Sequence, residues 1–249
     1  MNDLSLTDLY EAAARAAINE RCAPAYLHDV RGSLQALFGA LELLGRSARA
    51  GGGDLARVEK ACDLARRAIS RHEKSTIEAL QVLTLQHSMA AAVDIGALAR
   101  DVAHFLRNDA GNKAVRITVA SPEVLTVWAD RAKLQTLLAG LLAAAIDETS
   151  VGGEVPVTID RVEDEVAVSI GSHAGYDDID AVPDWSRRPS ARFQPKELTL
   201  LFAREFLAAN GGRLTIDNGV QPQGSLTLYY PAHESGTSFA ALRESETEK

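Results

Sequence analysis

The stretch LHDVRGSLQALFGALELL, residues 27–44, decides the fold. Its apolar residues recur at alternating spacings of three and four: Leu27, Val30, Leu34, Leu37, Leu41 and Leu44. This period places them along one seam of a helix of the coiled-coil or helix-bundle kind. The surrounding sequence extends the predicted helix over 7–47. Pro24 either kinks this helix or lies in the first turn of a new one.

A second helix of the same kind follows a short glycine turn. Gly51–Gly53 end the first helix, and Asp54 is a good N-cap for a helix that continues to about Gln86. The same alternating spacing returns at Leu55, Val58, Cys62, Ala65 and Ile69. Two long antiparallel helices form a hairpin that cannot bury both apolar seams alone. The sequence therefore predicts a homodimer whose two hairpins make a four-helix bundle.

Composition excludes several classes of protein. The net charge of −8 gives no support to nucleic-acid binding. No apolar run approaches the roughly 18 residues that cross a bilayer, and residues 1–20 do not resemble a signal peptide. The two cysteines form no CxxC pair, which favours reduced thiols. We therefore expect a cytoplasmic protein that binds neither membrane nor nucleic acid.

The remainder of the chain mixes helices and strands, which predicts an α+β fold. Helices are expected at 93–106, 129–149 and 197–210, and strands at 115–121, 125–129, 155–171 (a hairpin), 213–218 and 224–231, with a loop or lid at 171–196. The predicted domains are a helical hairpin over 1–88, an α/β sandwich over 93–231 with helices on one face of its sheet, and a disordered tail over 232–249.

His28 is the candidate reactive residue. It follows Leu27 of the seam, so it is expected on the solvent-facing flank of the bundle. A neutral imidazole is a competent nucleophile for phosphoryl groups near neutral pH. Asp29 can hydrogen-bond one ring nitrogen and fix the tautomer. Arg31 can face phosphoryl oxygens with its guanidinium or merely solvate the helix. The alternative is that His28 is an ordinary surface histidine.

The other histidines carry no such pattern. No HxxxH or similar metal-ligand spacing occurs among them, and they are interpreted as structural or surface residues: His72, His87, His104, His173 and His233. Gly32 interrupts the helix interior four residues after His28, at a cost of roughly 1 kcal/mol relative to alanine. A small residue there indicates either close approach of a partner protein or a bend in the helix.

The order of these segments resembles the core of sensor histidine kinases, over about residues 20–231. The stretch 27–44 looks like the family's H-box, in which an acid follows the phosphoacceptor histidine. The stretch 129–149 looks like the N-box, and 201–216 looks like the helix and strand after the glycine-rich lid. The resemblance implies that His28 is phosphorylated, with Asp29 and Arg31 as helpers, and that an ATPase-like domain follows the hairpin. Thr or Asn often supports phosphatase activity at the position of Gly32, so that activity is not expected.

The departures from the family concern ATP. The N-box asparagine positions, one of which holds magnesium in the family, fall on Gly140 and Ala144, and neither offers the oxygen that a hard cation needs. Ser172 replaces the adenine-binding aspartate, and Glu197 and Thr199 replace glycines that approach phosphates. The sequence therefore predicts a domain that does not bind ATP, and no cofactor of its own.

Together these features are most similar to dimeric ChpT-type histidine phosphotransferases. The resemblance implies a phosphorelay in which His28 exchanges phosphoryl groups with aspartates of response-regulator receiver domains. The receiver supplies Mg²⁺, and a hybrid histidine kinase is a further candidate partner. Two alternatives stay open at this point. One is a non-catalytic pseudokinase scaffold of two-component signalling, and the other is a divergent ATP-dependent histidine kinase.

Overall fold

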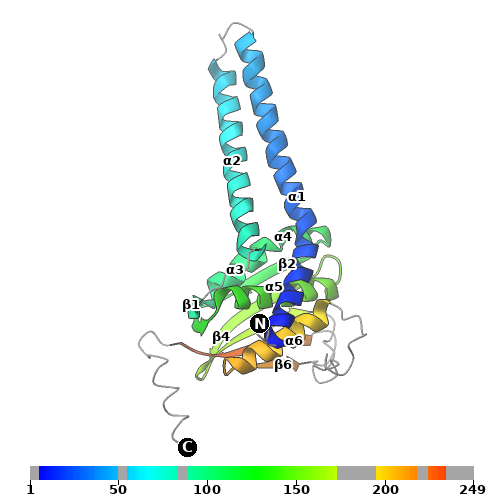
Figure 1. The fold of residues 1–249 in the computed structure, drawn as a ribbon, viewed down its shortest axis with the longest axis vertical. Coiled ribbons are helices and arrows are strands. Elements are labelled where there is room, and N and C mark those ends of the chain that lie inside the picture. Colours follow the sequence, from blue (N-terminus) through cyan, green and yellow to red (C-terminus); the bar gives the residue numbers. More distant parts are fainter. Residues whose placement is uncertain (1–5, 50–54, 84–88, 173–194, 218–223, 234–249) are drawn as a thin grey trace, which may run out of the picture. The chain divides into compact units, whose positions relative to one another are not determined.

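The computed structural model describes residues 6–49, 55–83, 89–172, 195–217 and 224–233. A long helical hairpin is followed by a mixed α/β domain, which confirms the predicted α+β class (Figure 1). The chain divides into two compact units. The hairpin unit comprises residues 19–86, and the α/β unit comprises residues 1–18 and 87–249.

The elements lie close to their predicted positions. The helices are α1 (Leu6–Arg49), α2 (Leu55–Leu83), α3 (Ile95–Phe105), α4 (Arg107–Asn112), α5 (Arg131–Glu148) and α6 (Pro195–Ala209). The strands are β1 (Ala91–Asp94), β2 (Arg116–Ala120), β3 (Thr126–Ala129), β4 (Glu154–Val162), β5 (Glu165–Ser172), β6 (Arg213–Asp217) and β7 (Gly224–Pro231). The start of the helix predicted over 93–106 was wrong. Val93 and Asp94, predicted to begin a helix, instead end strand β1, which pairs with β3.

Two helices make up the described part of the hairpin unit, and α1 runs through Pro24 without a break. Buried side chains recur every seven residues from Ser33 to Ser47 on α1 and from Ala61 to Ala68 on α2, and we infer that they face the other helix of the pair. We call these residues, with the half-buried ones between them, the inner seam. Its buried members are Cys22, Ser33, Ala40, Ser47, Ala61 and Ala68, and its half-buried members include Val30, Leu37, Leu44, Val58, Ala65, His72 and Thr76.

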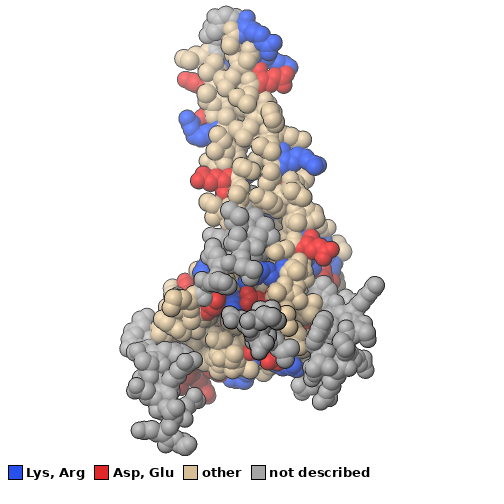
Figure 2. All heavy atoms as spheres, in the orientation of Figure 1, with Lys and Arg blue, Asp and Glu red and all other residues tan. Residues whose placement is uncertain are grey.

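A second row of apolar residues on the hairpin stays exposed. We call it the outer seam; it consists of Leu27, Leu34, Phe38, Leu41, Leu55, Cys62 and Ile69. Leu27 is 62% exposed and Phe38 is 69% exposed. Few charged side chains lie along the middle of the hairpin on the face in view in Figure 2. Of the six apolar residues in 27–44, every second one is half-buried at the inner seam and the others are exposed at the outer seam. This division is expected of a hairpin that packs against further helices.

The α/β unit is built on a five-stranded mixed sheet of order β2-β4-β5-β7-β6, in which only the β2–β4 pair is parallel among the described strands. Alternate residues of β4 are buried, so one face of the sheet meets the core. Helices α3, α5 and α6 contact this sheet. A two-stranded sheet, β1-β3, completes the described strands.

Helix α5 is the centre of the α/β core. Asp130 caps its first turn, accepting hydrogen bonds from the backbone nitrogens of Ala132 (2.9 Å) and Lys133 (3.1 Å). At the other end, the Lys113 amine donates to the carbonyl oxygens of Ile146 (3.0 Å) and Asp147. Nearly all residues from Leu134 to Ile146 are buried, including Gly140. Both ends of α5 are therefore fixed, and its middle packs on every side.

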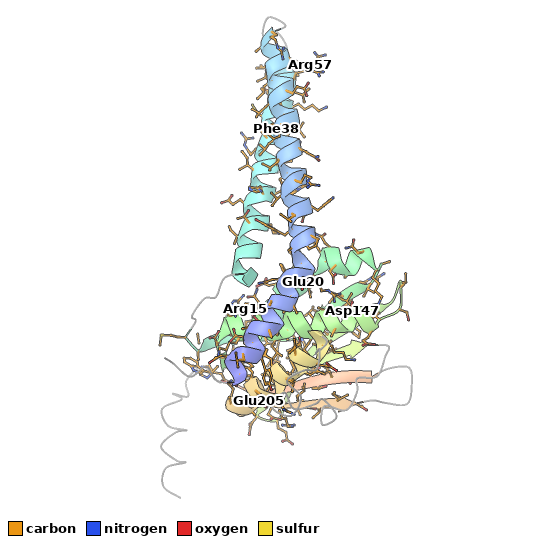
Figure 3. The ribbon with its side chains drawn as sticks, turned by 45° about the vertical axis from the view of Figure 1, so that its right-hand side comes forward. Arg15, Glu20, Phe38, Arg57, Asp147 and Glu205 are labelled. Atoms are coloured by element: carbon orange, nitrogen blue, oxygen red, sulfur yellow. The ribbon has the colours of Figure 1, made fainter. Side chains whose placement is uncertain are left out.

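The first three turns of α1 belong to the α/β unit. Figure 3 labels Arg15, which lies in this segment. Tyr10 and Ile18 of the same segment are buried. The Lys133 amine lies 3.2 Å from Asp8 Oδ1 and 3.3 Å from Glu11 Oε2. Burial lowers the pKa of this amine, but the two carboxylates outweigh burial, so the pKa of Lys133 is raised. Charged contacts thus fix the start of α1 to α5.

Two predicted features fall largely outside the described residues. These are the lid over 171–196, apart from its ends, and the tail beyond residue 233. The first two residues of the predicted tail are described and ordered by contacts. Ala232 pairs with Val127, and the His233 ring lies 5.1 Å from the Trp128 ring between centroids.

Candidate functional site

His28 lies on α1 with its side chain 87% exposed, on the flank of the hairpin as predicted. Its Nδ1 is 3.6 Å from Asp29 Oδ1, slightly beyond hydrogen-bonding distance. A small rotation of either side chain closes that distance. A hydrogen bond from Nδ1–H to the carboxylate would leave Nε2 with its lone pair facing solvent. The site therefore presents a nucleophilic nitrogen without a pocket around it.

The neighbours of His28 divide between an exposed face and a buried one. Arg31 is exposed, one helical turn after His28 and on the same side of α1. Asp29 is less exposed, with 28% of its side chain accessible, so it lies partly toward the inner seam. Ser33 is buried at 1% exposure, and its hydroxyl donates to the Asp29 carbonyl oxygen at 2.8 Å. This bond to the preceding turn satisfies a hydroxyl that has no access to solvent.

Gly32 is open on all sides within the chain. A Cβ added there would meet nothing within 4 Å, so packing within this molecule does not require glycine. This free space leaves room for another molecule beside residue 32. The helix continues through residue 32 without interruption.

The positions that the kinase resemblance assigns to magnesium and phosphate contact each other directly. A Cβ added at Gly140 would lie 2.6 Å from both Thr199 Oγ1 and Thr199 Cγ2. Real Cβ atoms do not approach so closely, so Thr199 of α6 occupies the space over Gly140 of α5. Both residues are buried, as is Ala144 one turn further along α5. The Thr199 side chain therefore fills the space over Gly140.

The ends of α5 and α6 near this contact are acidic. Glu148 closes α5, and Glu197 lies in the first turn of α6. The Lys196 amine is 3.0 Å from Glu148 Oε1, so that cation is already engaged. The side chain of Ser172, where the resemblance places the adenine-binding aspartate, and all of 173–194 lie outside the described residues. Gly140 and Ala144 carry no side-chain oxygen, so these two positions offer no ligand for Mg²⁺.

The described residues contain no group of three or more His, Cys, Asp or Glu placed to hold a metal ion. Among the described helices, none is both long and apolar enough to cross a bilayer.

Two features of the site were missed from the sequence. The contact of Thr199 with Gly140 joins residues far apart in the chain, and no local pattern indicates it. The sequence indicates no more than a structural or surface role for His72 and no role for Thr76, although both are half-buried at the inner seam of α2. The seven-residue spacing of Ala61, Ala68 and their neighbours was the signal that would have placed them opposite α1.

Comparisons with known proteins come from solved structures. No protein-family model matches the chain, and no curated protein matches it. The Acinetobacter baumannii histidine kinase AdeS resembles it at 14% identity and a TM-score of 0.47, over 83% of this chain and 98% of that one. A histidine kinase from Burkholderia phymatum shows 13% identity and a TM-score of 0.46, over 84% and 99%.

The mycobacterial sensor histidine kinase MprB shows 16% identity and a TM-score of 0.49, over 58% of this chain and 99% of that one. The structures similar to this chain thus include histidine kinases. At such identities, the residues of this chain have to decide its function.

Proposed function

We propose that this chain is a histidine phosphotransferase of two-component signalling. His28 accepts a phosphoryl group from the aspartyl phosphate of one receiver domain and passes it to the aspartate of another, without ATP. The observation that carries this proposal is that an exposed histidine occurs together with a filled space at position 140, where the kinase resemblance places an asparagine. His28 is 87% exposed, whereas Thr199 occupies the space over Gly140.

The flank around His28 suits a protein donor rather than a small one. A small phosphodonor is normally enclosed by its enzyme, which excludes water and fixes the reacting atoms. Here the imidazole stands free, with Arg31 exposed beside it and open space over Gly32. A receiver domain that docks on this face would bring its own acidic pocket and Mg²⁺. Charge neutralisation at the phosphoryl group then comes mainly from the partner.

The chemistry requires little from this chain beyond position and charge. Neutral His28 attacks phosphorus through Nε2, the bond from phosphorus to the aspartyl oxygen breaks, and the receiver carboxylate leaves. The product is an N-phosphorylated imidazolium that retains its proton on Nδ1. The Asp29 carboxylate stabilises that cation, and the Arg31 guanidinium offers donors to the phosphoryl oxygens. The reverse sequence delivers the group to a second receiver.

The exposed outer seam supports a homodimer. A second hairpin would cover these residues and complete a four-helix bundle, with His28 on its outer flank. We expect Leu34→Glu to raise the dimer dissociation constant by roughly a hundredfold or more, because it buries a charge in an apolar interface. Light scattering coupled to size exclusion measures this. Gln35→Glu, which adds the same charge at the neighbouring exposed position, is the control and should stay dimeric. A dimer that survives Leu34→Glu contradicts the assignment.

The function itself is tested by labelling the protein from two sources. One sample receives receiver domains of the same organism charged with ³²P-acetyl phosphate, and the other receives γ-³²P-ATP with Mg²⁺. We expect acid-labile label from the receiver and none from ATP. Calorimetry should detect no heat with ATP up to millimolar concentration. Label from ATP would instead identify a kinase, and label from neither source would favour a non-catalytic scaffold.

A further inference from the structure

Two layers of the inner seam differ from the rest of the hairpin. Most of its positions hold alanine, valine or leucine, as packing between two helices requires. On α2, however, the seam continues through His72 and Thr76, which are half-buried. The His72 Nδ1 and the Thr76 Oγ1 have no solvent access and no hydrogen-bond partner among the described residues. A buried polar atom left without a partner costs roughly 1–3 kcal/mol.

The polar layers lie beside the phosphoacceptor. Helices α1 and α2 run antiparallel, side by side, in Figures 1 and 3. The end of α1 at Arg49 therefore lies at the same end of the hairpin as the start of α2 at Leu55. Ser33 precedes Arg49 by roughly four and a half helical turns, and His72 follows Leu55 by nearly the same distance along α2. The inner seam thus places His72 across from Ser33.

The same register places Thr76 across from Asp29. Each of these residues lies about one further turn from the glycine end of the hairpin than Ser33 and His72 do. The Asp29 side chain is only 28% exposed, so part of its carboxylate lies toward α2. A carboxylate accepts hydrogen bonds on both oxygens, and a threonine hydroxyl or a protonated imidazole Nδ1 can donate them. Two donors without partners therefore stand on the helix that faces this acid.

We propose that His72 and Thr76 are positioning residues for phosphotransfer at His28. Neither bonds to Asp29 in the structure; a side-chain rotation or one buried water would let them donate hydrogen bonds to the inner side of its carboxylate. The bonds hold that carboxylate in place while its outer oxygen accepts from His28 Nδ1–H. This inference rests on the proposed function, and it deepens the account of the same site by adding the second helix to it.

The effect on the reaction follows from charge. His28 gains a positive charge when its Nε2 bonds to phosphorus, and its proton stays on Nδ1 throughout. A carboxylate already fixed beside Nδ1 stabilises that charge without having to reorganise. It also keeps the free imidazole in the tautomer whose Nε2 lone pair is available for attack. A mobile carboxylate would stabilise the positive charge less and would hold the Nδ1–H tautomer less firmly.

A purely structural role makes a different prediction. A polar layer in a helical bundle can fix register at a cost in stability, with no effect on chemistry. A register role predicts that apolar replacements leave stability equal or raise it, whereas positioning predicts at most a small loss of stability, because a hydrogen bond to Asp29 is removed together with the buried group. Only positioning predicts that the reaction slows in the same variants. The two quantities must therefore be measured together.

The kinetic test uses the full chain and a receiver charged with ³²P-acetyl phosphate. We expect Thr76→Val and His72→Leu each to slow transfer about tenfold, the lower end for loss of a group that orients a histidine. Thr76→Ser, which keeps the hydroxyl, should transfer at the wild-type rate. The amide nitrogen of asparagine lies where Nδ1 of histidine lies, whereas that of glutamine lies near the position of Nε2. Because the proposed donor is Nδ1–H, His72→Asn should transfer phosphate faster than His72→Gln. Ser47→Ala removes a buried hydroxyl from the same seam, far from His28, and should leave the rate unchanged.

A spectroscopic test needs no phosphate donor. Nitrogen-15 NMR of the His28 imidazole should show mainly the Nδ1–H tautomer in the wild type and a more even mixture in Thr76→Val. His28 signals and transfer rates that are unchanged in Thr76→Val and His72→Leu would overturn the inference. Transfer rates that fall only in variants with a lower melting temperature would also overturn it, because the loss would then reflect stability. If the wild type accepts no phosphate at all, the proposed function fails, whereas the NMR result still decides whether α2 positions Asp29.

Discussion

Replacing His28 with glutamine is expected to abolish phosphotransfer from a charged receiver, by roughly a thousandfold or more. An amide cannot form the phosphorus–nitrogen bond that the imidazole Nε2 forms. The substitution should leave folding unchanged, because the side chain is 87% exposed. Acid-labile label on the purified protein measures the effect. His104→Gln, on the α/β unit, is the control and should be labelled at the wild-type rate.

The neighbouring acid should show a graded effect in the same assay. Asp29→Asn keeps the size of the side chain but removes its negative charge, so the phosphoimidazolium loses its stabilisation. We expect transfer to fall roughly 10- to 100-fold, within the range found for loss of a group that orients a histidine. Acid-labile label that persists in His28→Gln would place the phosphoacceptor elsewhere and would end the assignment of this site.

Sequence alone predicted the hairpin because its determinants are local. The heptad of 27–44, the glycine turn and the second heptad each lie within a few helical turns. The position of His28 on the flank followed from its place beside Leu27. The exposure of Leu27 and the half-burial of Val30 did not, because a periodic pattern cannot divide its residues between two different neighbouring helices.

Tertiary contacts set the limits of prediction in the α/β unit. Val93 and Asp94 belong to a strand because β3 pairs with them, although their sequence continues smoothly into helix α3. The start of α1 belongs to the α/β unit because Lys133, distant in the chain, pairs with Asp8 and Glu11. In both places a distant partner overrides what the local pattern favours.

The sequence showed that positions 140 and 144 lack the asparagines of the kinase resemblance, but it did not show what occupies the space there. Gly140 and Ala144 could have left an open pocket that still admits a nucleotide or another ligand. Burial of Thr199 against Gly140 makes that region part of the hydrophobic core instead. A domain that uses this space for packing gains stability where an active kinase must keep a cavity. The position has therefore become a stability determinant, and that can be tested.

Gly140→Asn is expected to destabilise the α/β unit by about 2–4 kcal/mol. It restores the residue that the kinase resemblance places there, but the new Cβ would lie 2.6 Å from Thr199. Forcing extra atoms into a close-packed core costs about 1–3 kcal/mol, and a buried amide without partners adds to that. Urea unfolding followed by tryptophan fluorescence measures the shift. Gly39→Asn, at a helical glycine with nothing within 4 Å, is the matched control and should change stability little.

The partner residue provides the decisive comparison. Thr199→Gly alone should also destabilise, because it removes buried atoms and adds a glycine to a helix. Combined with Gly140→Asn, it should recover a large part of the lost stability, since the space that threonine occupied becomes available to asparagine. The two effects would then fall well short of adding. If the two changes in the free energy of unfolding add instead, Thr199 does not occupy the space that an asparagine at position 140 needs. An open space there would favour the alternative of a chain that binds ATP.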